Sequence, residues 1–191
     1  AEASNVLKSG KTTIVVDAGD GVAWQLAKAG VSLGEVQTVF LSHLHFDHTG
    51  GLFALLSQRF QINYPGVVTI YGPEGTKQTV DGIVQAMNPM YEDGGWILSK
   101  IQDSPAEKVK VVEITDDSKV AIDDIEVTVS KNTHFILAEK EGDTKVRGLS
   151  FRFELPDRSI VYTGDTGPSD DVIRLARGAD VLVTEIMDAQ V

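Results

Sequence analysis

The sequence is organised around one short segment, Leu41-Ser42-His43-Leu44-His45-Phe46-Asp47-His48-Thr49-Gly50-Gly51. It contains three of the chain's four histidines and one aspartate in the pattern H-x-H-x-D-H. The apolar, β-branched run 36–41 before it predicts a buried strand, and the apolar run 52–56 after it predicts a helix. We therefore expect the segment to form a loop between a strand and a helix, where a rigid scaffold commonly holds reactive side chains.

The residues of this segment are typical metal ligands. Neutral imidazole binds zinc and similar divalent ions, and carboxylate adds charge neutralisation. His43 and His45 stand two residues apart, so both rings can point the same way from an extended loop. Asp47 and His48 follow after the chain turns and face a neighbouring point, which predicts two metal positions side by side. The alternative is a set of solvated or hydrogen-bonded histidines without metal. This alternative would explain one isolated histidine better than it explains three histidines within six residues.

Two further ligand-type residues follow predicted strands. His134 lies just past the alternating strand 125–130, and Asp165 follows the apolar strand 159–162. With Asp17 at the end of the strand 13–17, strand ends offer ligand-type residues to one edge of a sheet.

These motifs resemble those of the metallo-β-lactamase-fold hydrolase superfamily. Residues 43–48 match its signature in full, and Asp17, His134 and Asp165 fall where its first, third and fourth motifs lie. The segments 17–21 and 39–43 are most similar to the transfer-RNA 3′-processing-nuclease-like branch, which also holds phosphodiesterases and arylsulfatase-like enzymes. The resemblance implies an α/β fold, a four-layer αβ/βα sandwich, over a single domain of residues 1–191 that lacks terminal segments at both ends.

The resemblance also implies a binuclear site for two divalent metal ions, zinc first and manganese or iron as alternatives. One ion would be held by His43, His45 and His134. The other would be held by Asp47, His48 and Asp165, with Asp165 shared between the two.

In this interpretation a hydroxide bridging the ions attacks the substrate, and Asp47 is the catalytic residue that orients it or accepts its proton. Asp17 orients the ligand loop or is a plain turn aspartate. Glu185 falls where the nuclease-like branch carries a proton-relay glutamate. The superfamily supplies one more histidine on a late strand, which this chain lacks up to Val191. That departure favours, as an alternative of another class, a degenerate metal-stabilised binding module.

Composition bears on partners and location. The chain of 191 residues has 28 acidic and 17 basic residues, a net charge of −11 and no cysteine. Such a charge repels phosphates, which disfavours nucleic acid and favours a small-molecule substrate. We expect a small phosphodiester or sulfate ester, with a lactone or β-lactam as the alternative. No apolar run is long enough for a membrane span. We therefore expect a soluble protein without membrane contact, cytoplasmic or exported, with a homodimer left open.

The sequence also predicts structure for three other parts of the chain. Residues 88–107, with Met90, Tyr91 and Trp96, would form either a lid over the site or a packed connection. Residues 139–145 would form a charged hairpin tip. The strands 109–114, 119–122, 125–130, 149–155 and 160–162 would form a second sheet, followed by a helix at 172–177 and a buried strand at 180–184.

Overall fold

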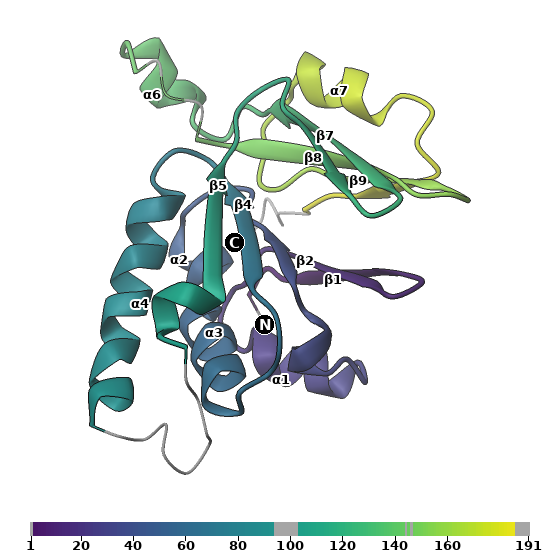
Figure 1. Ribbon diagram of the computed structural model, residues 1–191. Coiled ribbons are helices and arrows are strands. Elements are labelled where there is room, and N and C mark those ends of the chain that lie inside the picture. The colour runs from purple at the N-terminus through teal and green to yellow at the C-terminus, as the bar shows by residue number, and fades with distance from the viewer. Residues whose placement is uncertain (1, 94–102, 144, 146, 186–191) are drawn as a thin grey trace. The chain divides into compact units, whose positions relative to one another are not determined.

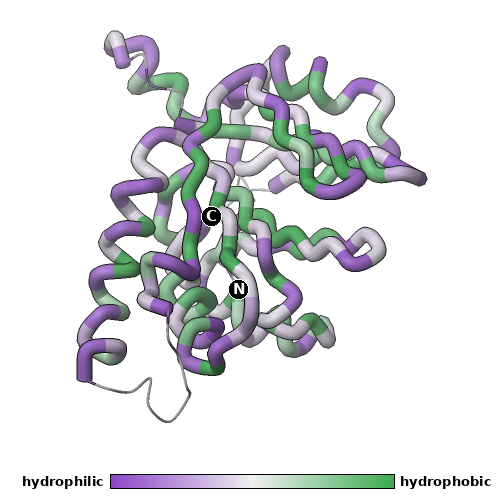
Figure 2. The backbone as a smooth tube through the Cα atoms, viewed as in Figure 1, coloured by the Kyte–Doolittle hydropathy of each residue, from purple (hydrophilic) through white to green (hydrophobic). Residues whose placement is uncertain are grey.

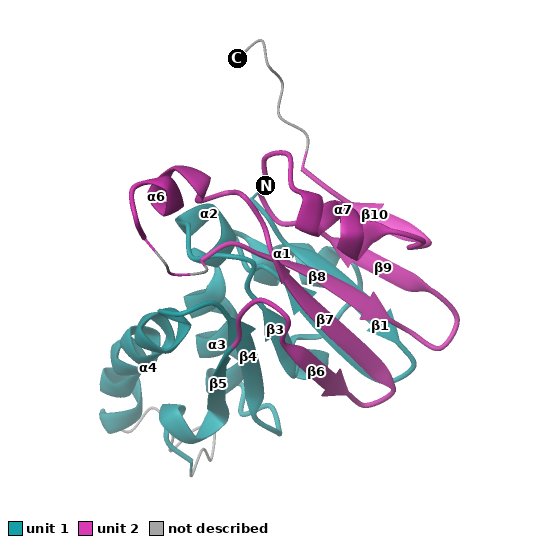
Figure 3. Cartoon of the chain, turned by 90° about the horizontal axis from the view of Figure 1, so that it is seen from above, with its two compact units in different colours: residues 1–113 teal, residues 114–191 magenta. Residues whose placement is uncertain are grey.

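A computed structural model describes residues 2–93, 103–143, 145 and 147–185 of the protein. The chain divides into two compact units, Ala1–Glu113 and Ile114–Val191 (Figure 3). Each unit is built on its own five-stranded sheet. None of the helices in the described part of the chain combines the length and apolar content needed to cross a bilayer.

The strands of the first sheet follow one another in sequence order (Figure 1). β1 (Asn5–Ser9) and β2 (Thr12–Val16) form an antiparallel hairpin. β3 (Thr38–Phe40), β4 (Val68–Gly72) and β5 (Val109–Glu113) then add in parallel to β2. Because parallel strands point the same way, the carboxyl ends of β2, β3 and β4 share one edge, where α/β folds usually bind their ligands.

Helices connect these strands, and their apolar faces build the core of the unit. Among the described residues they are α1 (Val22–Lys28), η1 (Leu33–Glu35), α2 (Phe46–Thr49), α3 (Leu52–Gln61), α4 (Thr76–Glu92) and η2 (Pro105–Lys108). Leu26, Leu55 and Val80 from the helices share one core cluster with Val39 and Ile70 from the sheet. Figure 2 shows hydrophilic and hydrophobic residues alternating along α4, as expected for a helix with one face on the core.

The second sheet is mainly antiparallel. β6 (Lys119–Ile122), β7 (Ile125–Lys131), β8 (Leu149–Glu154) and β9 (Ser159–Tyr162) pair antiparallel in sequence order, and β10 (Val181–Val183) pairs parallel with β9. Two helices, α6 (Ile136–Lys140) and α7 (Asp170–Ala176), belong to this unit. α7 packs against β7 and β8. The predicted α/β class and the two β-rich halves, each with its own helices, are confirmed.

The structure corrects four details of the predicted secondary structure. β5 pairs with β4 in the first sheet, not with the second sheet. α4 continues through Pro89 to Glu92, and so extends into the segment 88–107 that was expected to form a lid or a packed connection. Residues 136–140 form a helix, and the described part of 139–145 is its end and the turn after it, not a hairpin tip. β10 is exposed, not buried, because it pairs only with β9 among the described strands; Leu182 is 53% exposed.

Within the segment 88–107, the proposed lid, residues 94–102 with Trp96 lie outside the described residues. Its described ends are the last turn of α4 and the short helix η2. Met90 and Tyr91 pack against the core cluster of the first unit, which is what a packed connection requires.

Candidate metal centre

The ligand loop, residues 41–51, runs from the carboxyl end of β3 into α2 and α3. Leu41 N donates to the carbonyl of Tyr71 on β4 at 2.8 Å, and Gly51 N donates to the carbonyl of Ala18 at 2.8 Å. Leu41 is fully buried, and Leu44 packs against the core cluster of the unit. The apolar residues of the loop thus hold it on the sheet edge and leave the polar residues to form the site.

Asp17 anchors the loop from inside. Its carboxylate is fully buried; one oxygen accepts the Ser42 N–H at 2.7 Å, and the other accepts the Ser42 hydroxyl at 2.8 Å. The second oxygen also lies 2.8 Å from His48 Nδ1. The backbone of Asp17 has φ 60°, a left-handed conformation that aspartate and asparagine tolerate better than most residues. The expectation that Asp17 orients the ligand loop is therefore confirmed.

Two glycines let the loop lie directly on the turn that follows β2. A Cβ at Gly51 would come within 2.2 Å of the Gly19 carbonyl oxygen, and a Cβ at Gly19 would come within 2.1 Å of the Asp47 carbonyl oxygen. Ala18 N completes the contact by donating to the His48 carbonyl at 2.8 Å. Gly51 of the loop and Gly19 of the turn are thus both required for the close backbone approach.

These hydrogen bonds favour one tautomer in each of two imidazoles. An ionised carboxylate only accepts, so the contact with Asp17 places the His48 proton on Nδ1. The Ser42 hydroxyl donates to Asp17, so it can accept from His43 Nδ1 at 3.1 Å. In both rings Nε2 is then the nitrogen that carries a lone pair. Metal-bound histidines are commonly oriented by such carboxylate and hydroxyl partners.

The donor set of the first unit fits a divalent metal. In a tetrahedral site with Zn–N bonds of about 2.05 Å, two nitrogen ligands lie about 3.3 Å apart. His43 Nε2 and His45 Nδ1 lie 3.0 Å apart, with the two rings edge to face. His43 and His48 offer further ring nitrogens within 4.8 Å of each other. His43 is therefore the central ring of the three.

Asp47 differs from the histidines in exposure. Its side chain is 57% exposed, whereas His43 and His48 are nearly fully buried. One of its carboxylate oxygens lies 3.6 Å from His48 Nε2, and its carbonyl accepts from Ala3 N at 3.1 Å. The carboxylate therefore has a fixed backbone and an open approach from solvent.

His134 and Asp165 belong to the second unit, where one buried amide connects their segments. Asn132, the residue directly after β7, accepts the His134 N–H at 3.1 Å through its side-chain oxygen. Its side-chain nitrogen donates to the Thr163 carbonyl at 3.1 Å, two residues before Asp165. Glu185 accepts the Thr166 N–H at 2.8 Å, so its carboxylate holds the backbone beside Asp165.

Sequence reasoning missed Ser42 and Asn132. Both are buried, with 0% and 4% exposure, and both act by hydrogen bonds to other segments. Their only sequence signal was position, since each lies one or two residues before a candidate histidine.

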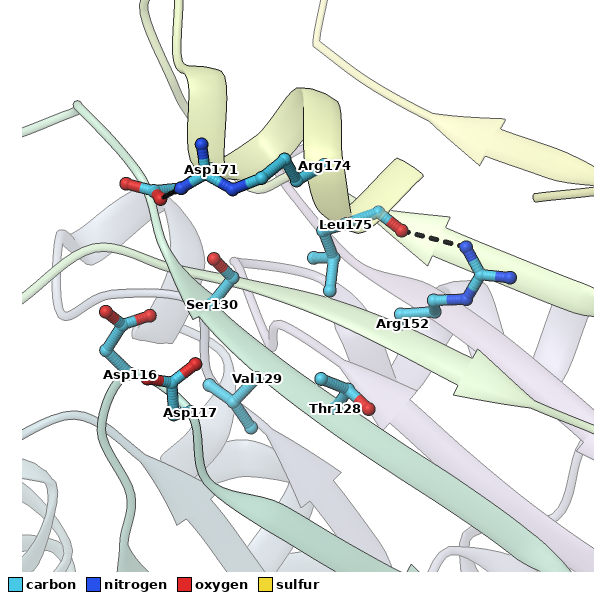
Figure 4. A pocket seen from close by; sticks show the side chains of 9 residues that line it. All are labelled: Asp116, Asp117, Thr128, Val129, Ser130, Arg152, Asp171, Arg174 and Leu175. Atoms are coloured by element: carbon cyan, nitrogen blue, oxygen red, sulfur yellow. Dashed lines mark hydrogen bonds and ion pairs between the residues drawn. The ribbon is translucent and has the colours of Figure 1, made fainter. Parts of the chain in front are cut away.

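A separate cavity of about 420 Å³ lies on the second unit between α7 and the β7–β8 face. Figure 4 shows its lining, which includes Asp116, Asp117, Asp171, Arg152 and Arg174. Arg174 pairs with Asp171, and Arg152 donates to the carbonyls of Leu175 and Arg177 at 2.9 Å. None of the lining residues is a candidate ligand, so this cavity is not part of the metal centre.

A strand-end loop with these ligands is typical of metallo-β-lactamase-fold hydrolases, and comparisons with known proteins agree. The profile of the beta-lactamase superfamily domain matches residues 12–190. The chain belongs to this family.

Within this family, the chain is similar to proteins named ribonuclease Z. Ribonuclease Z of Mycobacterium marinum (strain ATCC BAA-535 / M) is 30% identical over 188 residues, 96% of this chain and 63% of that protein. Ribonuclease Z of Mycobacterium sp. (strain KMS) is 32% identical over 183 residues, 94% of this chain and 60% of that protein. The chain thus spans less than two thirds of these relatives. The names agree with the nuclease-like branch inferred from the motifs.

The solved structures share the fold. The metallo-beta-lactamase fold protein YhfI from Bacillus subtilis has a TM-score of 0.69 at 21% identity, over 95% of this chain and 62% of that one. The short form of human tRNase Z has a TM-score of 0.66 at 20% identity, over 95% of this chain and 69% of that one. A fold of this kind implies a divalent metal.

These relatives correct one expectation. The prediction that nucleic acid is disfavoured as a partner is wrong, because the relatives are, by name, ribonucleases. The physical reason is that net charge describes the whole surface. Bound divalent cations, not the average surface, set the local field at a metal site.

Proposed function

We propose that this chain forms the metal-dependent core of a phosphodiesterase that hydrolyses RNA, as the name ribonuclease Z describes. The observation that carries the proposal is the ligand loop itself, with His43, His45 and His48 brought together and Asp17 fixing it from beneath. The relatives named ribonuclease Z supply the substrate class.

We propose the six ligands predicted from the motifs, with His43, His45 and His134 for one ion and Asp47, His48 and Asp165 for the other. Zinc suits the nitrogen-rich set best, although the same ligands accept manganese or iron. When bound, such ions supply Lewis acidity at the phosphoryl oxygens and a water whose pKa falls to about 7.

The chain's own residues perform the remaining tasks. Asp17 and Ser42 keep the protons of His48 and His43 on Nδ1, which presents Nε2 as the ligand atom. The carboxylate of Asp47, open to solvent on a fixed backbone, orients the attacking water or accepts its proton. Neither task needs a cysteine, which the chain lacks.

The proposal is tested by cleavage of an RNA with a 3′ extension, comparing wild type with Asp47→Ala. Asp81 is the matched control, because it is also an aspartate of the first unit and its side chain is 53% exposed. Asp47→Ala should lower the cleavage rate by at least about 10²-fold, a typical value for a lost general base. Asp81→Ala should cleave as wild type does. Equal activity of Asp47→Ala and wild type, or no RNA cleavage by metal-loaded wild type, would contradict the proposal.

A further inference from the structure

Phe46 is an exposed aromatic ring within the metal-ligand motif. It is 88% exposed, more than any other large hydrophobic residue of the described chain. It lies directly between the two proposed ligands His45 and Asp47, and consecutive Cα atoms are 3.8 Å apart. Any molecule that reaches these ligands therefore comes within one residue of the ring.

The core does not need this side chain. Within the loop, Leu41 is fully buried and Leu44 packs against the core cluster, so the inward positions are already filled. Phe46, by contrast, opens α2 and points outward. A single exposed apolar residue is common on protein surfaces, so exposure alone assigns it no role. Its place and its rigid support are the additional observations.

The backbone that carries Phe46 is held on both sides. Its carbonyl accepts from Gly50 N at 2.6 Å, and the His45 carbonyl accepts both His48 N and the Thr49 hydroxyl at 3.0 Å. The Asp47 carbonyl is bonded to Ala3 N. The ring is thus presented from a fixed backbone with two side-chain torsions to order. Rigid aromatic residues of this kind give contact area at low cost in conformational entropy.

We propose that Phe46 stacks on a nucleobase next to the cleaved phosphate. The inference rests on the proposed RNA hydrolysis and names the contact that positions the substrate. Bases stack on exposed aromatic rings regardless of sequence, because every base has a π-face. A flat, open ring suits this partner. An aliphatic acyl chain would need enclosing apolar walls, which an 88% exposed ring among His45 and Asp47 lacks in the described structure.

The test compares Phe46→Ala, Phe46→Leu and Phe46→Trp on RNA substrates that differ in one base. After the cleaved bond is mapped, each flanking nucleotide is replaced in turn by an abasic one. Phe46→Ala and Phe46→Leu should lower kcat/KM about tenfold on the intact RNA, the size of one lost stacking contact. On the RNA that lacks the stacked base they should equal wild type. Phe46→Trp should restore the intact-RNA value.

A spectroscopic readout accompanies the kinetics. 2-Aminopurine at the same nucleotide loses fluorescence when it stacks, so binding should quench it with wild type and Phe46→Trp but not with Phe46→Ala. Trp24→Ala is the control, because Trp24 is an exposed aromatic of the same unit outside the loop, 66% exposed. It should leave cleavage and quenching unchanged. Metal content of each variant shows whether the loop is intact.

The outcomes separate the two proposals. In one outcome, wild type cleaves RNA while Phe46→Ala lowers kcat/KM by the same factor on intact and on abasic RNA. That result would contradict the proposed stacking and leave the proposed function standing. The same holds if Phe46→Ala loses nothing. If Phe46→Ala also loses metal, the stacking proposal is tested with Phe46→Leu instead, by the same dependence of kcat/KM on the base and the same fluorescence quenching. If metal-loaded wild type cleaves no RNA, the proposed function itself is wrong.

Discussion

At the scale of single residues, Asp17 is the buried residue that anchors the ligand loop. Three polar groups converge on its buried carboxylate: Ser42 N–H, the Ser42 hydroxyl and His48 Nδ1. Residues that orient metal ligands in this way affect metal affinity without touching the ion. The charge of Asp17 and its backbone conformation can be tested separately, because asparagine tolerates the same φ of 60°.

We predict that Asp17→Asn weakens metal binding by about 10–100-fold, since the neutral amide no longer holds His48 by charge. It should also lower the free energy of unfolding by about 1–3 kcal/mol, because an amide nitrogen replaces a buried acceptor. Zinc titration and urea unfolding measure the two effects. Asp81→Asn, at an exposed surface position, is the control. Unchanged zinc affinity in Asp17→Asn would show that the loop does not depend on this carboxylate.

At the scale of elements, two glycines of the first unit have opposite roles. Gly51 joins the ligand loop to α3, and an added Cβ would come within 2.2 Å of the Gly19 carbonyl oxygen. Gly82 lies inside α4, and nothing lies within 4 Å of its added Cβ. The same substitution should therefore change stability in opposite directions at the two sites.

We predict that Gly51→Ala lowers the free energy of unfolding by about 1–3 kcal/mol through overpacking. Gly82→Ala should raise it by about 0.5–1 kcal/mol, because alanine loses less backbone entropy in a helix. Thermal and urea unfolding of both variants provide the measurement. A neutral Gly51→Ala would mean that loop and turn can separate without cost.

The second sheet offers a test by pH. Asp180, just before β10, accepts the backbone N–H and hydroxyl of Ser159 at 2.7 and 3.0 Å, which fixes the start of β9. Hydrogen bonds from the Ser159 backbone and side chain lower the pKa of the Asp180 carboxyl from its ordinary 3.8. A lowered pKa in the folded state means that the carboxylate stabilises the fold above pH 3.8, and that this contribution is lost as the pH falls through the folded-state pKa.

We therefore predict that Asp180→Asn lowers Tm at pH 6 and that the difference from wild type shrinks as the pH falls below about 4. Melting curves across pH 3–6 check this. Asp157 is the comparison for Asp180, because its pKa is also lowered, but by the side chain of its neighbour Arg158 at an exposed site. A Tm difference between Asp180→Asn and wild type that stays constant across this range would contradict the assignment.

At the scale of the whole molecule, the sequence predicted what local pattern controls. The order strand, H-x-H-x-D-H loop, helix was visible because an apolar, β-branched run precedes the loop and a second apolar run follows its two glycines. The family resemblance followed from the same residues. β5 was placed in the wrong sheet because a short apolar strand carries no information about its partner, which tertiary packing against β4 and α4 decides.

Hydrogen bonds between distant segments could not be predicted from the sequence for the same reason. Nothing in the sequence around Asn132 indicates that its amide joins the His134 segment to Thr163. Net charge was misleading in a different way. It is a property of the whole surface, whereas substrate choice is set at the site. The family relatives, not composition, provided that correction.

Whether the loop is the centre of a binuclear site is tested most directly by the metal content of the purified chain, measured by elemental analysis after dialysis. We predict two divalent ions per chain in wild type and in Asp81→Ala, and a clear loss in His43→Ala, whose ring contacts both His45 and His48. One ion per chain would contradict the binuclear assignment. No bound metal in wild type, at any zinc or manganese supplement, would contradict the metal centre altogether.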